Sequence, residues 1–346
     1  MMEATMTTGF EQGLILDLEG VDLEAYAPLA HEVATPLAYR ESIVEHFEGD
    51  PDNTGAWLPW GTTHDLRFRP QECSIVTGQN FSGKSSLLGQ AAIGWLRGNS
   101  TINEKVLLIS PEMSPQQSLA RMVRQMTAKI PAQVTEADVN ACLVWLEGKF
   151  WVYTAVGQVS VADLNNVIRY TAGEMDVTQV IVDNLSVLEL EGQDTNRAQA
   201  DLMTKFVHTS RTSGCHITLV AHNRKPAQGE KPSRYQISGS GALSNLADNV
   251  ISVVRNERKE EKLADLSLSD EDRADIKAQA DTRLIVQKQR HGTAYTGTSK
   301  LYYSPYSMRW SEDRRSPDLA IPEIKTMAEL GEPNTRGYQH ERSVPY

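Results

Sequence analysis

Apolar and polar positions follow two alternating patterns along most of the chain. From about residue 65, eight short apolar runs have the length and β-branched content of strands: 73–77, 106–110, 150–154, 177–182, 216–221, 249–255, 283–288 and 300–304. Between the first four runs lie helical patterns over 84–96, 115–130 and 161–172. Strands that alternate with helices predict an α/β domain built on a mostly parallel, twisted sheet flanked by helices.

The best-marked helix is the one over 115–130. Ser114 and Gln117 fit the two ends of a capping box, and Pro115 suits the first helical position. Apolar side chains recur on one face at helical spacing, namely Leu119, Met122, Val123 and Met126. We predict that this stripe belongs to the core.

The regions that flank the alternating pattern differ from it. A short amphipathic helix is predicted over 35–47, with Thr35 as its cap and Pro36 at its first position. The chain is therefore divided into an acidic, partly disordered arm, a linker helix with a turn-rich joint, the α/β domain with a charged helical insertion at 257–281, and a mostly disordered, proline-containing tail: 1–34, 35–64, 65–310 and 311–346.

Charge is distributed unevenly along the 346 residues. The net charge is −11, and such an acidic balance argues against nucleic-acid binding, because phosphates are contacted by Lys and Arg. Residues 1–52, however, hold twelve carboxylates and one base, Arg40, whereas the remaining residues hold 33 acids and 33 bases. The body of the protein is therefore neutral, and the acidic segment is either a solvated tail or an interaction arm.

Cysteine content and hydropathy indicate the compartment. Cys73, Cys142 and Cys215 are odd in number and widely spaced, which fits neither a zinc knuckle nor a disulfide framework. No run approaches the roughly 18 apolar residues that a membrane helix requires. The first residues are acidic and lack the basic and apolar regions of a secretory signal. We expect a cytoplasmic protein without membrane contact.

Residues 78–85, GQNFSGKS, fit the phosphate-loop pattern G-x-x-x-x-G-K-S between an apolar strand and a helix. Successive backbone N–H groups and the helix N-terminus form an anion site there. The motif predicts binding of ATP or another nucleoside triphosphate, with Lys84 on the β- and γ-phosphates and Ser85 on Mg²⁺. The nucleotide-binding residues are predicted to be Gly78, Asn80, Ser82, Gly83, Lys84, Ser85 and Ser86.

Two acidic residues complete the predicted chemistry. Asp183 ends the β-branched run at 180–182, where its carboxylate can hold the metal's water shell. Asn184 follows it, so the Asp-Glu pair of AAA+ ATPases is missing. Glu112, just past the strand at 106–110, is the best candidate for the base that polarises water. The alternative is that this glutamate stabilises the start of a helix through its charge, and position alone favours neither interpretation.

A basic segment follows the strand at 216–221. Residues 223–241 carry four bases against one acid and are rich in Pro, Gly and Ser, so they cannot build a core. Such a segment can track a nucleic-acid backbone with its cations and its exposed N–H groups. A solvated surface loop is the alternative. The candidate DNA contacts are Arg224, Lys225, Lys231, Arg234, Ser238 and Gly239.

Five motifs, taken in order, resemble those of DnaB-type replicative helicases of superfamily 4, which have a RecA fold. They are SPEMS, VIVDN, LVAHNRKP, SGSGALSNLADNVISVVRNER and VQKQRHG. The helicase halves of phage primase-helicases and of Twinkle are the most similar members. The resemblance covers roughly residues 37–310 and includes no primase portion. It implies a RecA-like P-loop NTPase core with antiparallel strands near its C-terminal end.

The resemblance also implies catalytic roles. Glu112 corresponds to the general base. His222 corresponds to a γ-phosphate sensor that links hydrolysis to the DNA loop, although a histidine at a strand end is otherwise read as structural. Lys288 and Arg290 correspond to a pair that a neighbouring subunit inserts to stabilise charge in the transition state.

Three further positions correspond to nucleotide contacts. Arg255 and Tyr303 resemble the residues that sandwich the base, whereas without the resemblance they would be a surface arginine and an edge-strand tyrosine. Asn245 lies where relatives usually carry glutamine.

The resemblance thus implies an ATP- and Mg²⁺-dependent DNA helicase that assembles as a hexameric ring. It would translocate 5′→3′ on single-stranded DNA and unwind forked DNA at a replication fork, in the cytoplasm of a bacterium or phage-infected cell. A separate primase, polymerase or loader would be its partner. The alternatives are a RecA-type recombinase or recombination mediator, and a nucleotide-switched regulatory ATPase without unwinding activity.

Overall fold

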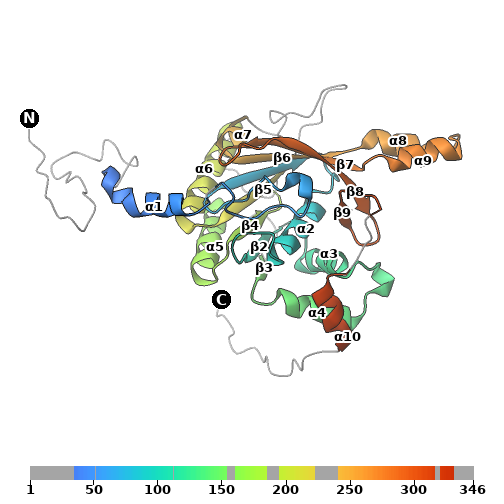
Figure 1. The fold of residues 1–346 in the computed structure, drawn as a ribbon, viewed down its shortest axis with the longest axis horizontal. Helices are drawn as coiled ribbons and strands as arrows, with labels where there is room; N and C mark the ends of the chain where they lie inside the picture. The colour runs from blue at the N-terminus through green and yellow to red at the C-terminus, as the bar shows by residue number, and fades with distance from the viewer. Residues whose placement is uncertain are drawn as a thin grey trace, which may run out of the picture. The chain divides into compact units, whose positions relative to one another are not determined.

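The computed structural model describes residues 35–50, 52–111, 113–153, 160–184, 195–222, 241–315 and 320–330 (Figure 1). The chain divides into two compact units, 1–53 and 54–346, which we describe separately. In the first unit, a 3₁₀ turn over Pro36–Tyr39 leads into α1 (Arg40–Glu48). Pro36 takes the first position as predicted, but the Thr35 side chain makes no capping hydrogen bond. The side chains of Leu37 and Phe47 are exposed.

In the described part of the second unit, nine strands form one sheet in the order β3-β2-β4-β5-β1-β6-β7-β8-β9. The first six strands in this order are parallel and the last three are antiparallel to their neighbours, which confirms the predicted fold class. The strands are β1 (Cys73–Gly78), β2 (Val106–Ile109), β3 (Phe150–Tyr153), β4 (Gln179–Val182), β5 (His216–His222), β6 (Asn249–Arg255), β7 (Thr282–Gln289), β8 (Gly297–Ser304) and β9 (Arg309–Ser311).

Helices cover both faces of this sheet. Successive residues of each strand point to opposite sides, so both faces carry apolar side chains that helices bury. On β1, Ile75 packs with the helices of one face and Val76 with those of the other. Figure 1 shows α5 and α6 together on one side of the sheet and α2 and α3 on the other. The helices of the two cores are α2 (Lys84–Leu96), α3 (Pro115–Thr127), α4 (Glu136–Leu146), α5 (Val161–Glu174), α6 (Thr195–Ser213) and α7 (Gly241–Leu246).

The predicted capping box at the start of α3 is present. Ser114 Oγ accepts from Gln117 N, and Gln117 Oε1 accepts from Ser114 N, both at 3.3 Å. The helix ends earlier than predicted, because Ala128 adopts a left-handed conformation with φ of 56°. Met122 and Met126 of the predicted stripe are buried in the core.

Three further helices lie in the described residues after β6. The charged insertion is helical, with α8 (Glu257–Ala264) and α9 (Asp270–Ala278). Residues expected in a mostly disordered tail form α10 (Pro322–Leu330), where Ile321 and Ile324 are buried beside α3 and α4. The backbone N–H of Ile321 donates to the Met126 carbonyl. None of the helices in the described ranges is long and apolar enough to span a membrane.

Candidate nucleotide-binding site

The junction between β1 and α2 builds the phosphate loop. The chain leaves β1 at Gly78, passes Phe81 with φ of 61°, and enters α2 from Gly83 with φ of 90°. A Cβ atom at Gly78 would lie 2.4 Å from the Val253 carbonyl oxygen, so only glycine allows β6 to approach the loop. The local structure is the strand, loop and helix that the motif requires.

Lys84 lies at the centre of this loop. Its buried ammonium donates to the carbonyl oxygens of Gly78 at 3.0 Å and Gln79 at 2.8 Å, and lies 3.5 Å from His222 Nδ1. On the other side of the ring, the Asn184 side-chain Nδ2 atom lies 2.9 Å from His222 Nε2. Polar contacts at both ring nitrogens therefore hold the His222 ring in one orientation beside Lys84.

The loop offers a buried donor that suits a phosphate. Ser82 is 2% exposed, and its Oγ atom has no hydrogen-bond partner within the described residues. A buried hydroxyl without a partner is costly unless a ligand satisfies it. A phosphate oxygen beside Gly83 and the start of α2 would accept from it. The residues present therefore fit a nucleoside triphosphate.

The residues predicted to hold the metal lie together. Ser85 at the start of α2 and Asp183 after β4 line one small cavity, together with Ser110 and Arg121. Hydroxyl and carboxylate oxygens are the ligands that Mg²⁺ prefers. The backbone N–H of Asp183 donates to Ile109 O at 2.8 Å, which fixes the position of this residue. The donor set therefore fits Mg²⁺ bound between Ser85 and Asp183.

Aromatic residues of β8 and β9 flank the same loop. The rings of Tyr303 and Trp310 have centroids 4.7 Å apart, and the Trp310 ring lies against Gly83. Burial raises the pKa of the Tyr303 hydroxyl, so it stays protonated. Arg255, at the end of β6, donates from Nη1 to the Phe81 carbonyl at 3.3 Å. The structure thus places Arg255 on the phosphate loop and Tyr303 behind Trp310, and their contact with a base stays a prediction.

We expect Gly83→Ala to lower the affinity for ATP by about tenfold or more. Residue 83 would be strained at φ of 90°, and its Cβ atom would lie 2.4 Å from Trp310 Cζ2, so the loop must move. Gly98→Ala is the matched control, because Gly98 has φ of 101° but nothing within 4 Å of the added atom. Titration with a fluorescent ATP analogue should show weaker binding only for Gly83→Ala. Equal affinities in both variants would contradict this assignment.

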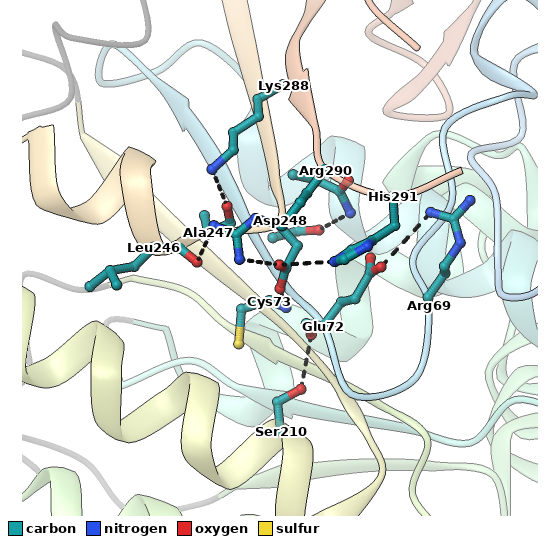
Figure 2. A network of polar contacts seen from close by, with 12 residues as sticks. Arg69, Glu72, Cys73, Ser210, Leu246, Ala247, Asp248, Lys288, Arg290 and His291 are labelled. Atoms are coloured by element: carbon teal, nitrogen blue, oxygen red, sulfur yellow. Dashed lines mark hydrogen bonds and ion pairs between the residues drawn. The ribbon is translucent and has the colours of Figure 1, made fainter. Parts of the chain in front are cut away.

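Other predicted residues lie at the opposite edge of the sheet. Lys288 and Arg290, at the end of β7, contact the last turn of α7 and Asp248, the residue before β6 (Figure 2). Asn245 lies with them, and its carbonyl oxygen accepts from both cations. Asp248 N donates to Cys73 O at the start of β1, whereas the phosphate loop begins at the other end of that strand. Five residues of strand separate the two ends by roughly 16 Å.

A buried carboxyl group lies beside this cluster. Burial raises the pKa of Glu72 from 4.5 to about 7; Arg69 lowers it in part, and Asp248 raises it further. In the folded protein, Glu72 therefore retains a proton that the unfolded chain loses above pH 4.5. This difference makes the free energy of unfolding fall as pH rises from about 4.5 to 7.

Glu72→Gln removes this titration. The stability of the variant relative to wild type is therefore expected to increase between pH 5 and pH 8, by up to about 3 kcal/mol. Urea unfolding at the two pH values measures the change. Glu104→Gln is a comparison variant, since Glu104 is also buried with a raised pKa but lies outside this cluster. Parallel pH profiles for wild type and Glu72→Gln would contradict the prediction.

Several predicted residues lie outside the described ranges. They are the candidate base Glu112 and the six candidate DNA contacts Arg224, Lys225, Lys231, Arg234, Ser238 and Gly239. Asn80 and Ser86 are described; Ser86 is buried at the start of α2, where its Oγ donates to Met308 O at 2.9 Å. This bond ties α2 to the β8–β9 hairpin.

Sequence reasoning missed three residues of this site and one residue beside Arg290. Asn184 had a signal, since it follows Asp183 directly, but its contact with His222 spans 38 residues. No local sequence pattern marks the other three residues. Only tertiary contacts place Trp310 against the loop, Arg121 at the cavity and Asp248 beside Arg290.

The chain is similar to several known proteins. Residues 63–228 match the AAA domain family, although Asn184 replaces the glutamate expected of AAA+ ATPases. The chain is 22% identical over 214 residues to the DNA helicase/primase of Enterobacteria phage T3, a match that covers 56% of this chain and 37% of the relative. The chain thus spans just over a third of that protein's length.

Two solved structures share the fold. The first is an ATPase domain that superposes with a TM-score of 0.63 at 16% identity, covering 79% of this chain and 98% of the other. The second, a DnaB-like replicative helicase solved in a study of its interactions with primase, gives 0.61 at 16% identity, covering 82% and 68%. The comparisons confirm the RecA-like fold and the resemblance to DnaB-type replicative helicases.

Proposed function

We propose, from a P-loop core that resembles DnaB-type replicative helicases, that this chain is an ATP-dependent helicase that moves along single-stranded DNA. The main support for this proposal is the contact between Lys84 and His222. Lys84, in the phosphate loop, lies 3.5 Å from His222, the last residue of β5. The chain runs directly from His222 into the basic segment at 223–241. A residue beside the phosphate loop is therefore followed directly in the chain by the segment that has the composition to bind DNA.

The residues of the site support hydrolysis of the terminal phosphate. The Lys84 ammonium and the N–H groups at the start of α2 would stabilise negative charge on the phosphates. Glu112 would accept the proton of the attacking water. Ser85 and Asp183 would hold Mg²⁺, which when bound would neutralise negative charge on the phosphates. His222, oriented by Asn184, would exchange its contact with Lys84 for one with the γ-phosphate, and this exchange would move the segment that follows it.

Lys288 and Arg290 cannot serve the nucleotide of their own chain. They lie at the edge of the sheet opposite the phosphate loop, roughly 16 Å away along β1, which exceeds the reach of either side chain. We therefore propose that they act on the nucleotide of a neighbouring copy. Repetition of such a head-to-tail contact forms a ring when its rotation closes, and a hexameric ring is the assembly that we propose.

The basic segment gives a separate prediction. Replacement of the four bases of this segment with glutamate is expected to abolish binding to single-stranded DNA, because contacts with phosphates supply most of that affinity. The four bases are Arg224, Lys225, Lys231 and Arg234. Hydrolysis without DNA should stay within about twofold, because this change leaves the phosphate loop intact. Fluorescence anisotropy with a labelled oligonucleotide measures the effect. Unchanged affinity would place the DNA elsewhere.

Unwinding of forked DNA tests the whole proposal. Substrates with a 5′ or a 3′ tail distinguish the direction, and we expect unwinding from the 5′ tail. A RecA-type recombinase would form filaments with DNA and an ATP analogue instead of rings, which electron microscopy distinguishes. Hydrolysis that DNA neither stimulates nor requires, without unwinding, would indicate a regulatory ATPase and overturn the helicase proposal.

A further inference from the structure

A buried carboxylate lies beneath the cations at the edge of the sheet opposite the phosphate loop. The Asp248 side chain is 4% exposed; its Oδ1 atom lies 2.9 Å from Arg290 Nη1, and its Oδ2 atom accepts from Cys73 N at 2.9 Å. The backbone of Arg290 is held as well, since its N–H donates to the Asp248 carbonyl at 2.9 Å. Figure 2 shows Asp248 between the start of β1 and Arg290. Arg290 is therefore fixed at two points by one residue.

The end of α7 holds the second cation. Lys288 Nζ donates to the carbonyl oxygens of Ser244, Asn245 and Ala247 at 3.0, 3.0 and 2.6 Å. Arg290 Nη2 donates to the Asn245 carbonyl at 2.8 Å. The last carbonyls of a helix lack partners within the helix and carry partial negative charge, so they favour cations. Lys288 and Arg290 are thus held side by side by α7 and Asp248.

This arrangement suits an arginine that has to reach a phosphate on another molecule. Long basic side chains lose conformational freedom when they bind, and restraint beforehand reduces that loss. The buried Asp248 can aim one edge of the Arg290 guanidinium, which is planar and has N–H donors on several sides. Arg290 itself remains partly exposed, with 34% of its side chain accessible.

We infer that Asp248 is a positioning residue, which aims Arg290 at the triphosphate bound by a second copy of this chain. The inference rests on the proposed function, in which Lys288 and Arg290 act on a neighbouring nucleotide. It goes further by assigning a role to Asp248, a buried residue whose carboxylate holds Arg290. Loss of the Asp248 charge should slow the chemical step and leave ATP binding nearly unchanged.

Asp248→Asn tests the inference, because it keeps the shape of the side chain and removes the charge. Asp138→Asn is the matched control: its carboxylate is 5% exposed and lies 2.7 Å from the Lys129 ammonium, away from the nucleotide site. We expect kcat of the assembled ATPase to fall by about tenfold to a hundredfold in Asp248→Asn with KM within about twofold. Asp138→Asn should lower the melting temperature and leave kcat unchanged.

Arg290→Ala distinguishes the proposed role of the Lys288 and Arg290 pair from the role of Asp248. If Asp248 acts through Arg290, the double variant Asp248→Asn/Arg290→Ala should be no slower than Arg290→Ala alone. Full activity of Arg290→Ala would refute the proposed role of the pair. A slow Arg290→Ala enzyme combined with a wild-type kcat for Asp248→Asn, or with a further loss in the double variant, would overturn the positioning role only. If Asp248→Asn does not fold, Asp248→Glu decides: a lower kcat at unchanged KM supports the inference, and a wild-type kcat overturns it.

Discussion

Lys84→Ala is expected to lower the rate of ATP hydrolysis by about 10²- to 10³-fold, the usual loss when a group that stabilises transition-state charge is removed. Lys84 is 6% exposed, and its ammonium donates to the loop carbonyl oxygens of Gly78 at 3.0 Å and Gln79 at 2.8 Å. In this position, little water screens its charge. The variant also loses the contact between Lys84 and His222, so DNA should no longer stimulate the residual hydrolysis.

Lys105→Ala is the control for this experiment. The Lys105 ammonium also donates to a backbone carbonyl, that of Met175 at 3.0 Å, and to the Asp176 carboxylate at 3.0 Å, but it lies just before β2 and away from the loop. Its removal should cost some stability without changing kcat. Steady-state hydrolysis with and without DNA, together with melting temperatures, measures both effects. A similar loss of kcat in both variants would mean that the effect is one of folding.

The strands and the phosphate loop were predictable because local sequence determines them. Parallel strands buried on both faces are continuous apolar runs, and Val180, Ile181 and Val182 of β4 are all buried. The phosphate loop needs glycine at Gly83, where φ is positive, and this requirement is visible in the motif. Eight predicted strand runs therefore coincide with described strands within a few residues.

Elements whose stability depends on distant partners were less predictable. The polar helix α6 buries Leu202, Met203 and Phe206, but charged and hydroxyl residues between them obscured the pattern. The prolines near α10 suggested disorder, whereas Pro322 occupies its first position and Ile324 packs into the core. The contacts of Lys288 with α7 span more than 40 residues, so no local pattern reports them.

The role of the Lys288 and Arg290 pair gives a prediction that depends on subunit arrangement. Arg290→Ala should abolish most hydrolysis and leave ATP binding nearly intact, because the phosphate loop is unaltered. Lys84→Ala should be inactive for the opposite reason, since its own loop is impaired while its Arg290 is intact. If each site combines one subunit's loop with the next subunit's Arg290, the two inactive variants carry complementary defects.

Mixing the two variants before assembly should therefore restore activity. In a random equimolar mixture, about a quarter of the contacts join an intact loop from an Arg290→Ala subunit to an intact Arg290 from a Lys84→Ala subunit. Hydrolysis should rise toward that fraction of the wild-type rate, and less if neighbouring sites depend on each other. The control mixture, Arg290→Ala with the Lys84→Ala/Arg290→Ala double variant, contains no intact Arg290 and should stay inactive. A mixture no more active than its separate components would mean that Arg290 does not act across subunits. Within one chain, Arg290 and Lys84 lie at opposite ends of β1, so an intact site requires two subunits.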